Sequence, residues 1–147
     1  MKTQLYCLMM ETQQDLEFID ITQRVRECVV QSQVASGFAV VYSKHTTAAV
    51  KINENEPLLL EDMKQVLERF APRNGAYQHN DFSIRTVNMT PDECPNGHAH
   101  CQHLLLGTSE TVPIAEGTIH VGTYQSIFLI ELDHPRSREV LVQIVGE

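Results

Sequence analysis

The chain has 147 residues, and 11 Lys and Arg against 19 Asp and Glu give it a formal net charge of −8 at pH 7. This length predicts one domain over residues 1–147 and excludes a complete (β/α)₈ barrel, which takes about 250 residues. The negative charge excludes a general attraction to nucleic-acid phosphates, and no apolar run approaches the roughly 20 residues of a membrane span, so we expect neither partner.

The first third of the chain alternates between strand and helix patterns. Apolar residues predict strands over residues 2–10 and 15–19. A helix follows, with Thr22 as its N-cap, and Ser36-Gly37 ends it. Its expected buried face is made of Val25, Cys28, Val29 and Ser32. Two further strands are predicted over residues 38–43 and 47–52.

The middle third predicts a second helix and a long polar loop. Asn55 is the expected N-cap of this helix, and Pro57 suits its first turn. Residues 77–96 are polar and rich in turn-forming residues, so we expect an irregular loop followed by a short helix over 97–106. The apolar stripe of the second helix consists of Leu59, Met63, Val66, Leu67 and Phe70.

The last third predicts only strands. They cover residues 108–113, 119–131 with a break near Gly122, and 140–146. Short turns join most strands of the chain, which favours antiparallel pairing. We therefore expect an α+β fold with a mostly antiparallel, β-sandwich-like core and two main helices packed on one side.

Seven histidines are the clearest chemical signal, and three of them crowd residues 97–103. On a helix, His98 and His100 point apart, whereas His100 and His103 could face one metal ion. In an extended segment, His98 and His100 would share a face instead. The local sequence leaves both arrangements open, along with a third in which these histidines are simply solvated.

Two polar clusters outside that segment are further candidates. His79 and Asp81 lie two residues apart in the polar loop, where a carboxylate can orient a metal-bound imidazole. The competing interpretation is an ordinary surface turn at Asn80-Asp81. Asn53 and Glu54 follow a predicted strand and remain candidates for ligand binding, although helix capping explains the adjacent Asn55 and Glu56.

Four cysteines without a C-x-x-C pair, and no signal-peptide pattern at the N-terminus, favour a reduced, cytoplasmic protein. Cys94 or Cys101 could be a nucleophile beside a histidine, but no third partner is evident. Ser109 offers a hydroxyl that could face an anion, or could simply begin a strand.

Six motifs in this order resemble the YjbQ-like family, whose members are often named secondary thiamine-phosphate synthases. The resemblance covers essentially the whole chain. Tyr124 stands where many members carry Trp, and His134 stands where Gly often precedes Pro-Arg. The motifs are His45-Thr46-Thr47-Ala48-Ala49, Asn53-Glu54-Asn55, Tyr77 to Asp81, Ala99-His100, Leu105 to Ser109 and Gly122 to Gln125.

The resemblance implies a homotrimer with a polar pocket in which His45, His79 and His100 bind a divalent metal, with Zn²⁺ as the first candidate. It selects His100 from the histidine cluster and gives Asp81, with His79, a catalytic role as base or orienting group. The residues expected to bind the small-molecule ligand are Asn53, Glu54, Ser109 and Gln125.

The expected function is that of a small metal-dependent enzyme acting on a phosphorylated compound, as a thiamine-phosphate synthase-like transferase with weak activity or a hydrolase. An acidic chain would need a divalent cation to hold pyrophosphate. A non-catalytic trimeric metal- or ligand-binding protein is the alternative, and histidines that serve only the trimer interface are a third. The basic residues that could help the cation to bind pyrophosphate are Lys44, Lys51, Arg73, Arg85 and Arg136.

Overall fold

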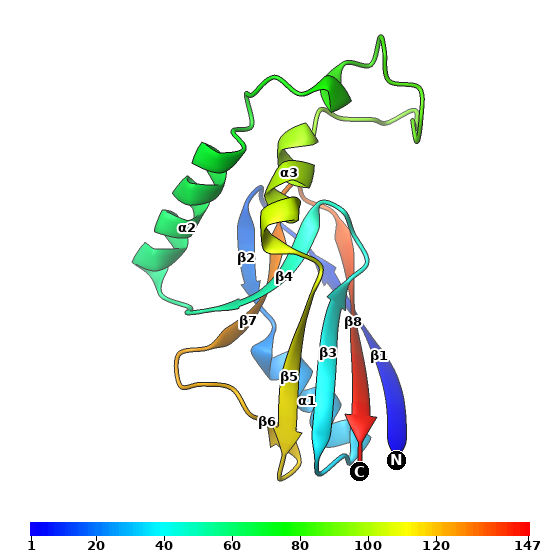
Figure 1. Cartoon of the computed structure of the whole chain (residues 1–147), viewed down its shortest axis with the longest axis vertical. Coiled ribbons are helices and arrows are strands. Elements are labelled where there is room, and N and C mark those ends of the chain that lie inside the picture. Colours follow the sequence, from blue (N-terminus) through cyan, green and yellow to red (C-terminus); the bar gives the residue numbers. More distant parts are fainter.

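A computed structural model describes residues 1–147 and contains two antiparallel sheets (Figure 1). This arrangement confirms the expected α+β class and the sandwich-like core. The larger sheet has the strand order β1 (Lys2–Glu11), β8 (Ser137–Gly146), β3 (Gly37–Ser43), β5 (Ser109–Ala115) and β6 (Thr118–Ile119). The smaller sheet has the order β2 (Glu17–Asp20), β7 (Ser126–Glu131) and β4 (Ala48–Asn53).

Strand β7 lies in the middle layer of the molecule, because it is buried on both faces. Ile127 and Leu129 belong to the main core between the two sheets. Phe128 and Ile130 point the other way, into a second apolar cluster under the helices. Successive side chains of a strand alternate between faces, so four consecutive apolar residues require a cover on each side.

Helix α1 (Thr22–Ser32) contributes to the main core with the buried face that its periodicity predicts. The expected N-cap is wrong by one residue, because Ile21 occupies that position and Thr22 begins the helix. The Thr22 hydroxyl instead donates to Asp20 at 2.6 Å and accepts the Ile127 N–H at 2.8 Å. It therefore ties the start of α1 to strand β7.

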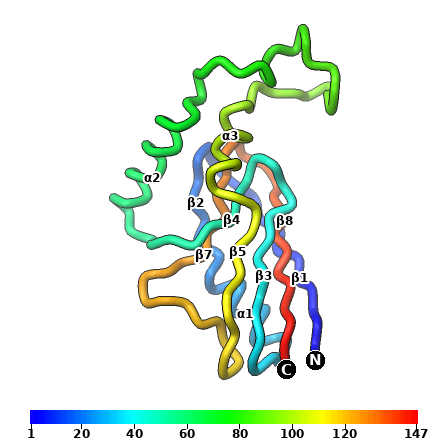
Figure 2. The backbone as a smooth tube through the Cα atoms, in the orientation of Figure 1, coloured from blue at the N-terminus to red at the C-terminus, as the bar shows by residue number.

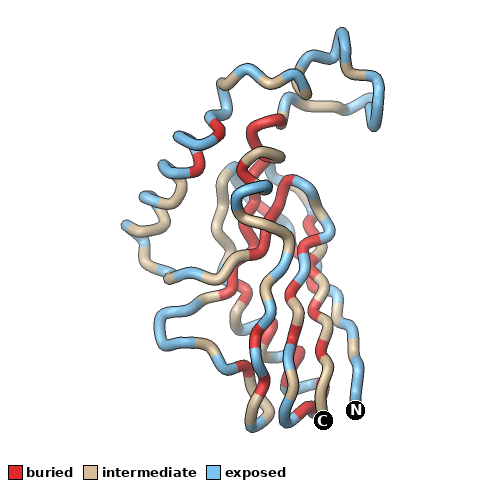
Figure 3. The backbone as a smooth tube through the Cα atoms, viewed as in Figure 1, coloured by how far each residue is buried: buried red, intermediate tan, exposed pale blue.

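Helices α2 (Pro57–Phe70) and α3 (Gly97–Leu106) cover the outer face of the smaller sheet (Figures 1 and 2). The N-cap of α2 is Glu56 rather than Asn55, and its carboxylate accepts the N–H groups of Leu58 and Leu59. Only Leu67 of the predicted apolar stripe is fully buried. Figure 3 shows a contrast between the helices, with α2 largely exposed and the start of α3 buried. The helices also do not share one side of the molecule, because α1 packs on the larger sheet.

The segment between α2 and α3 projects at the end of the molecule opposite the two termini (Figure 1). It contains a single short 3₁₀ turn, η1 (Gln78–Asn80), as its polar composition predicts. All four cysteines are free thiols. No helix has the length and apolar character that crossing a membrane requires.

Candidate functional site

A polar cavity of about 360 Å³ lies where this segment meets α3 and the loops that end the strands. No apolar side chain contributes to its lining. Its walls come from the β3–β4 turn, η1, the long loop, α3 and the β7–β8 turn. The lining residues are Thr46, Thr47, His79, Arg85, Asn88, Glu93, Asn96, His100 and Arg136.

Two of the predicted histidines meet in this cavity. The rings of His79 and His100 lie 4.6 Å apart between centroids, at an interplanar angle of 69°. The Asn80 side-chain oxygen accepts the Gly97 N–H at 2.9 Å, which joins η1 to the first residue of α3. This hydrogen bond lies at the junction that brings together histidines 21 positions apart in the sequence.

The surroundings of His100 favour its neutral form. Burial lowers the pKa of His100, and the neighbouring His79 lowers it further, against a weaker opposing effect of Asp133. A neutral imidazole is the form that binds a metal or accepts a proton. His100 can therefore act as a metal ligand or as a proton acceptor.

His45 is not part of this pair. Its Nε2 accepts the Glu139 backbone N–H at 2.8 Å, which uses the lone pair that a metal would need. Burial lowers the pKa of His45, and the Arg138 charge lowers it further.

The only group of three metal-ligand side chains with ligand atoms within 4.8 Å of one another is Cys94, Asp133 and His134. The predicted set of three histidines is thus not assembled by this chain in this conformation.

The other histidines of α3, His98 and His103, do not line the cavity. Residues 97–106 are helical throughout, which turns His98 away from His100. His98 is 2 % exposed, and neither of its ring nitrogens has a hydrogen-bond partner. Burial lowers the pKa of His103, which is hydrogen-bonded to the His45 backbone. Neither residue shares a metal-ligand group with His100.

Arginines supply the positive charge of the cavity. Arg85 pairs with Glu93 at 2.7 Å and donates to the Asn88 carbonyl at 2.9 Å, so it folds the long loop onto itself. Arg136 donates to the Asp133 carboxylate at 2.8 Å. Of the five basic residues considered for pyrophosphate, these two line the cavity.

Asp133, the carboxylate that pairs with Arg136, is buried. Burial raises its pKa, but the hydrogen bond from Asn96 and the Arg136 charge outweigh that effect and leave the pKa below its ordinary value. The Asn96 amide donates to Asp133 at 2.9 Å. Asp133 therefore holds Asn96 and Arg136 in place as a carboxylate.

The predicted catalytic carboxylate, Asp81, has a local structural role. Its Oδ1 accepts the Ser83 N–H at 3.0 Å and also the Ser83 hydroxyl. These hydrogen bonds lower the pKa of Asp81. Asp81 does not line the cavity, although its neighbour His79 does.

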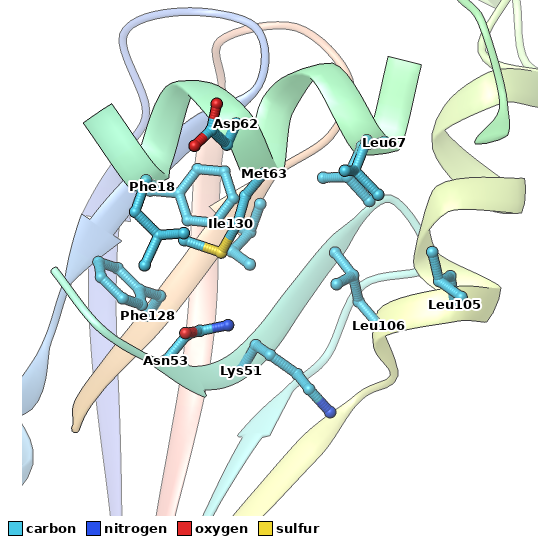
Figure 4. A pocket seen from close by; sticks show the side chains of 12 residues that line it. Phe18, Lys51, Asn53, Asp62, Met63, Leu67, Leu105, Leu106, Phe128 and Ile130 are labelled. Carbon is cyan, nitrogen blue, oxygen red and sulfur yellow. The ribbon is translucent and has the colours of Figure 1, made fainter. Parts of the chain in front are cut away.

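A second pocket is apolar and separate from the histidines. It has a volume of about 290 Å³ and lies between α2, the end of α3 and the smaller sheet (Figure 4). Of the four predicted ligand-binding residues, Asn53 lines this pocket, while Glu54, Ser109 and Gln125 line neither. The Gln125 side chain instead accepts the Gly122 N–H at 2.8 Å and closes a turn.

Thr47, Glu93 and Asn96 belong to the cavity but were not among the predicted site residues. Thr47 belongs to the first of the six family motifs, His45 to Ala49, and Asn96 precedes the glycine that starts α3. Their polar character alone carries no chemical signal, because threonine and asparagine are common in turns. Only the folded arrangement singles them out.

Comparison with known proteins gives consistent matches over almost the whole chain. The family described as UPF0047 protein YjbQ-like matches residues 7–147. A UPF0047 protein of Methanothermobacter thermautotrophicus is 38 % identical over 95 % of this chain and 90 % of its own. The UPF0047 protein YugU of Bacillus subtilis is 30 % identical over 97 % of this chain and 99 % of its own.

Solved structures agree with this assignment. The crystal structure of a YbjQ-like protein of unknown function from Sulfolobus solfataricus has a TM-score of 0.88 and 33 % identity, covering 99 % of each chain. A protein of the YjbQ/UPF0047 family from Clostridium acetobutylicum has a TM-score of 0.84 and 36 % identity. It covers 95 % of this chain and 99 % of its own.

Proposed function

Because this chain belongs to the UPF0047 family of YjbQ-like proteins, we propose that its polar cavity binds a small phosphorylated compound together with a divalent metal ion. The observation that carries the proposal is the His79–His100 pair. The ring centroids lie 4.6 Å apart, in a cavity that Arg85 and Arg136 also line. Imidazoles favour a metal, and guanidinium groups favour phosphate oxygens.

The cavity supplies some, but not all, of the ligands that a metal ion needs. His79 and His100 supply two imidazole nitrogens, and Zn²⁺ is the first candidate because it takes nitrogen ligands and is usually four-coordinate. His45 would join only by giving up its hydrogen bond to Glu139. Otherwise water, the phosphate of the bound compound or a neighbouring subunit completes the site. Such an ion would activate water or polarise a phosphoryl oxygen.

The charges of the cavity suit an anion despite the negative net charge. Arg85 and Arg136 are each paired with one carboxylate, of Glu93 and Asp133 respectively. A guanidinium has five N–H donors, so each arginine retains donors for a phosphate. Thr46 and Thr47 also line the cavity and would add neutral hydroxyl groups.

The reaction we favour is a transfer or hydrolysis at a phosphorylated small molecule. Thiamine-phosphate formation, in which a pyrimidine pyrophosphate and a thiazole phosphate join and pyrophosphate leaves, is one candidate for assay. A non-catalytic metal- or ligand-binding protein is the alternative. Bound metal without turnover of any assayed phosphorylated compound would favour that alternative.

Elemental analysis of untagged protein, purified without added metal, tests the metal site. We expect His100→Ala to lose about one equivalent per chain relative to wild type, because an imidazole ligand is removed. His103→Ala is the matched control on the same helix and should retain the metal. Equal metal content in wild type and His100→Ala, after equilibration with Zn²⁺, would contradict the proposal.

Thermal unfolding with pyrophosphate tests the anion site. A ligand that binds the folded state raises the melting temperature by mass action. We expect this increase in the wild type and its loss in Arg85→Gln, with Lys44→Gln as the control outside the cavity. An increase that is equal in all three proteins would show that pyrophosphate binds elsewhere.

Self-association into a homotrimer is part of the same proposal. Leu58, Leu104 and Leu105 on α2 and α3 are 75 %, 82 % and 50 % exposed, so these helices present apolar side chains that an interface between copies would cover. Light scattering of the purified chain measures the assembly directly. A mass of one chain would contradict a trimer.

A further inference from the structure

A cysteine, an aspartate and a histidine meet beside the polar cavity, in an arrangement that the proposed function does not use. The Cys94 sulfur lies 3.6 Å from Nδ1 of His134 and 3.9 Å from Oδ2 of Asp133. The Nδ1 of His134 lies 3.1 Å from Oδ1 of Asp133. Cys94 comes from the long loop, whereas the other two residues come from the β7–β8 turn, 39 and 40 positions further along the chain.

One ligand atom from each of the three residues lies within 4.8 Å of the other two, near the ligand spacing of a tetrahedral metal site. Zinc bonds of about 2.0 Å to nitrogen or oxygen and 2.3 Å to sulfur place neighbouring ligand atoms roughly 3.3–3.8 Å apart. Thiolate, imidazole and carboxylate are the three ligand types that proteins use for zinc. We propose that Cys94, Asp133 and His134 form a zinc site, separate from the His79–His100 pair, with one coordination position left open.

Cys94 and His134 also line a polar hollow of about 330 Å³, whereas Asp133 lies buried beside it. The other lining residues are Thr90, Asp92, Glu93, Asn96 and Arg136. Three protein ligands and one open position are typical of catalytic rather than structural zinc sites. The site would therefore take water, or a small anion as a fourth ligand.

Asn96 orients one of the proposed ligands, Asp133. Its amide nitrogen donates to Oδ2 of Asp133 at 2.9 Å, and hydrogen bonds of this kind orient a metal-binding carboxylate. The Asn96 side-chain oxygen is buried and has no hydrogen-bond donor. A water molecule bound to the metal could supply that donor.

Arg136 competes with the ion. Its Nη2 lies 2.7 Å from each ring nitrogen of His134 and 2.8 Å from Oδ2 of Asp133. A dication and a guanidinium repel one another at this distance, so zinc binding displaces Arg136 from His134. The displaced guanidinium would turn toward the polar cavity, which it also lines, and would be free to bind an anion.

Titration of the full chain with Co²⁺ tests the site, because a cobalt–thiolate bond gives a charge-transfer absorption that imidazole ligands do not produce. In the wild type we expect this absorption to saturate at about one equivalent per chain and to be abolished when Zn²⁺ replaces Co²⁺. Cys94→Ser should abolish it. Cys101→Ser is the matched control, because Cys101 is also a partly buried free thiol but lies outside the cluster.

Further variants separate this site from the proposed histidine site. His79→Ala should retain the cobalt–thiolate absorption, whereas His134→Ala should weaken cobalt binding by about tenfold or more. His134 is exposed, so its replacement also tests the site if Cys94→Ser fails to fold. Arg136→Gln should tighten cobalt binding by about tenfold, because the competing charge is removed. No absorption in the wild type, or an absorption that Cys94→Ser leaves intact, would overturn the proposal.

Discussion

Arg138 of β8 and Glu131 of β7 form a buried ion pair that joins the two sheets. The Arg138 Nε donates to the carboxylate at 2.8 Å, a second hydrogen bond runs from Nη2, and the side chains are 2 % and 0 % exposed. Nη2 also donates to the carbonyl and hydroxyl oxygens of Thr47, at 3.2 and 3.0 Å. Because Thr47 lines the polar cavity, this pair links the core to the site.

Removing one partner of this pair should strongly destabilise the protein. Arg138→Met leaves the Glu131 carboxylate buried without its counter-ion, so we expect the free energy of unfolding to fall by about 3–5 kcal/mol. Urea denaturation monitored by circular dichroism measures the change. The double variant Arg138→Met/Glu131→Leu should lose clearly less, because no unpaired charge remains. A single variant as stable as the double variant would argue against this account.

His98 should make stability depend on pH. Burial lowers the pKa of His98, and the Arg73 charge lowers it further. The unfolded chain therefore takes up a proton near the ordinary histidine pKa of about 6.5, while folded His98 stays neutral, so stability falls as the pH decreases through that region.

His98→Leu should reduce the slope of unfolding free energy against pH between about 7 and 5, by at most about 1.4 kcal/mol per pH unit. The buried, non-titrating Gln102 on the same helix provides the control. Gln102→Leu should shift the overall stability and leave the slope as it is. Equal slopes for His98→Leu and the wild type would show that another group titrates.

Two neighbouring residues of α2 should respond very differently to truncation. Leu67 is 3 % exposed and packs in the second apolar cluster, so Leu67→Ala should cost about 2–5 kcal/mol. Val66 is 53 % exposed, and Val66→Ala should stay within about 0.5 kcal/mol of the wild type. Urea denaturation of both variants makes the comparison. A large loss for Val66→Ala would indicate that its surface is covered in solution.

A side chain at Gly97 should destabilise the protein, because Gly97 contacts Tyr77 at the junction of η1 and α3. A Cβ on Gly97 would lie 2.6 Å from the Tyr77 Cβ. We expect Gly97→Ala to lower the free energy of unfolding by about 1–2 kcal/mol, after the gain of about 1 kcal/mol that alanine brings to a helix. Thermal unfolding checks this value. At Gly122 the nearest atom would be 3.3 Å away, at the end of the Gln125 side chain, so Gly122→Ala is the milder control.

The elements of this fold follow from local patterns in the sequence. The apolar spacing of residues 25–32 predicts the buried face of α1, and the predicted limits of α3 agree with the structure. The strand predicted over residues 119–131 with a break near Gly122 corresponds to β6 and β7, although the break extends from residue 120 to 125. Local periodicity suffices for these features, because helices and strands place side chains at fixed angles along the chain.

The predicted site was only partly recoverable from the sequence. The motif resemblance selected His79 and His100, which the fold brings together, and also His45, whose ring nitrogen is occupied by the Glu139 N–H. A motif gives the identity of a residue, but it does not give the hydrogen bond that the side chain makes in the folded protein.

The sequence by itself determined the class of fold, the helices and most strands, because these depend on spacing within a few residues. Only the tertiary structure decided which distant polar side chains meet. It places Cys94 beside His134, and Glu131 with Arg138 between two sheets. Such contacts depend on how the sheets pack and where loops of irregular backbone return, and neither follows from a local periodic pattern.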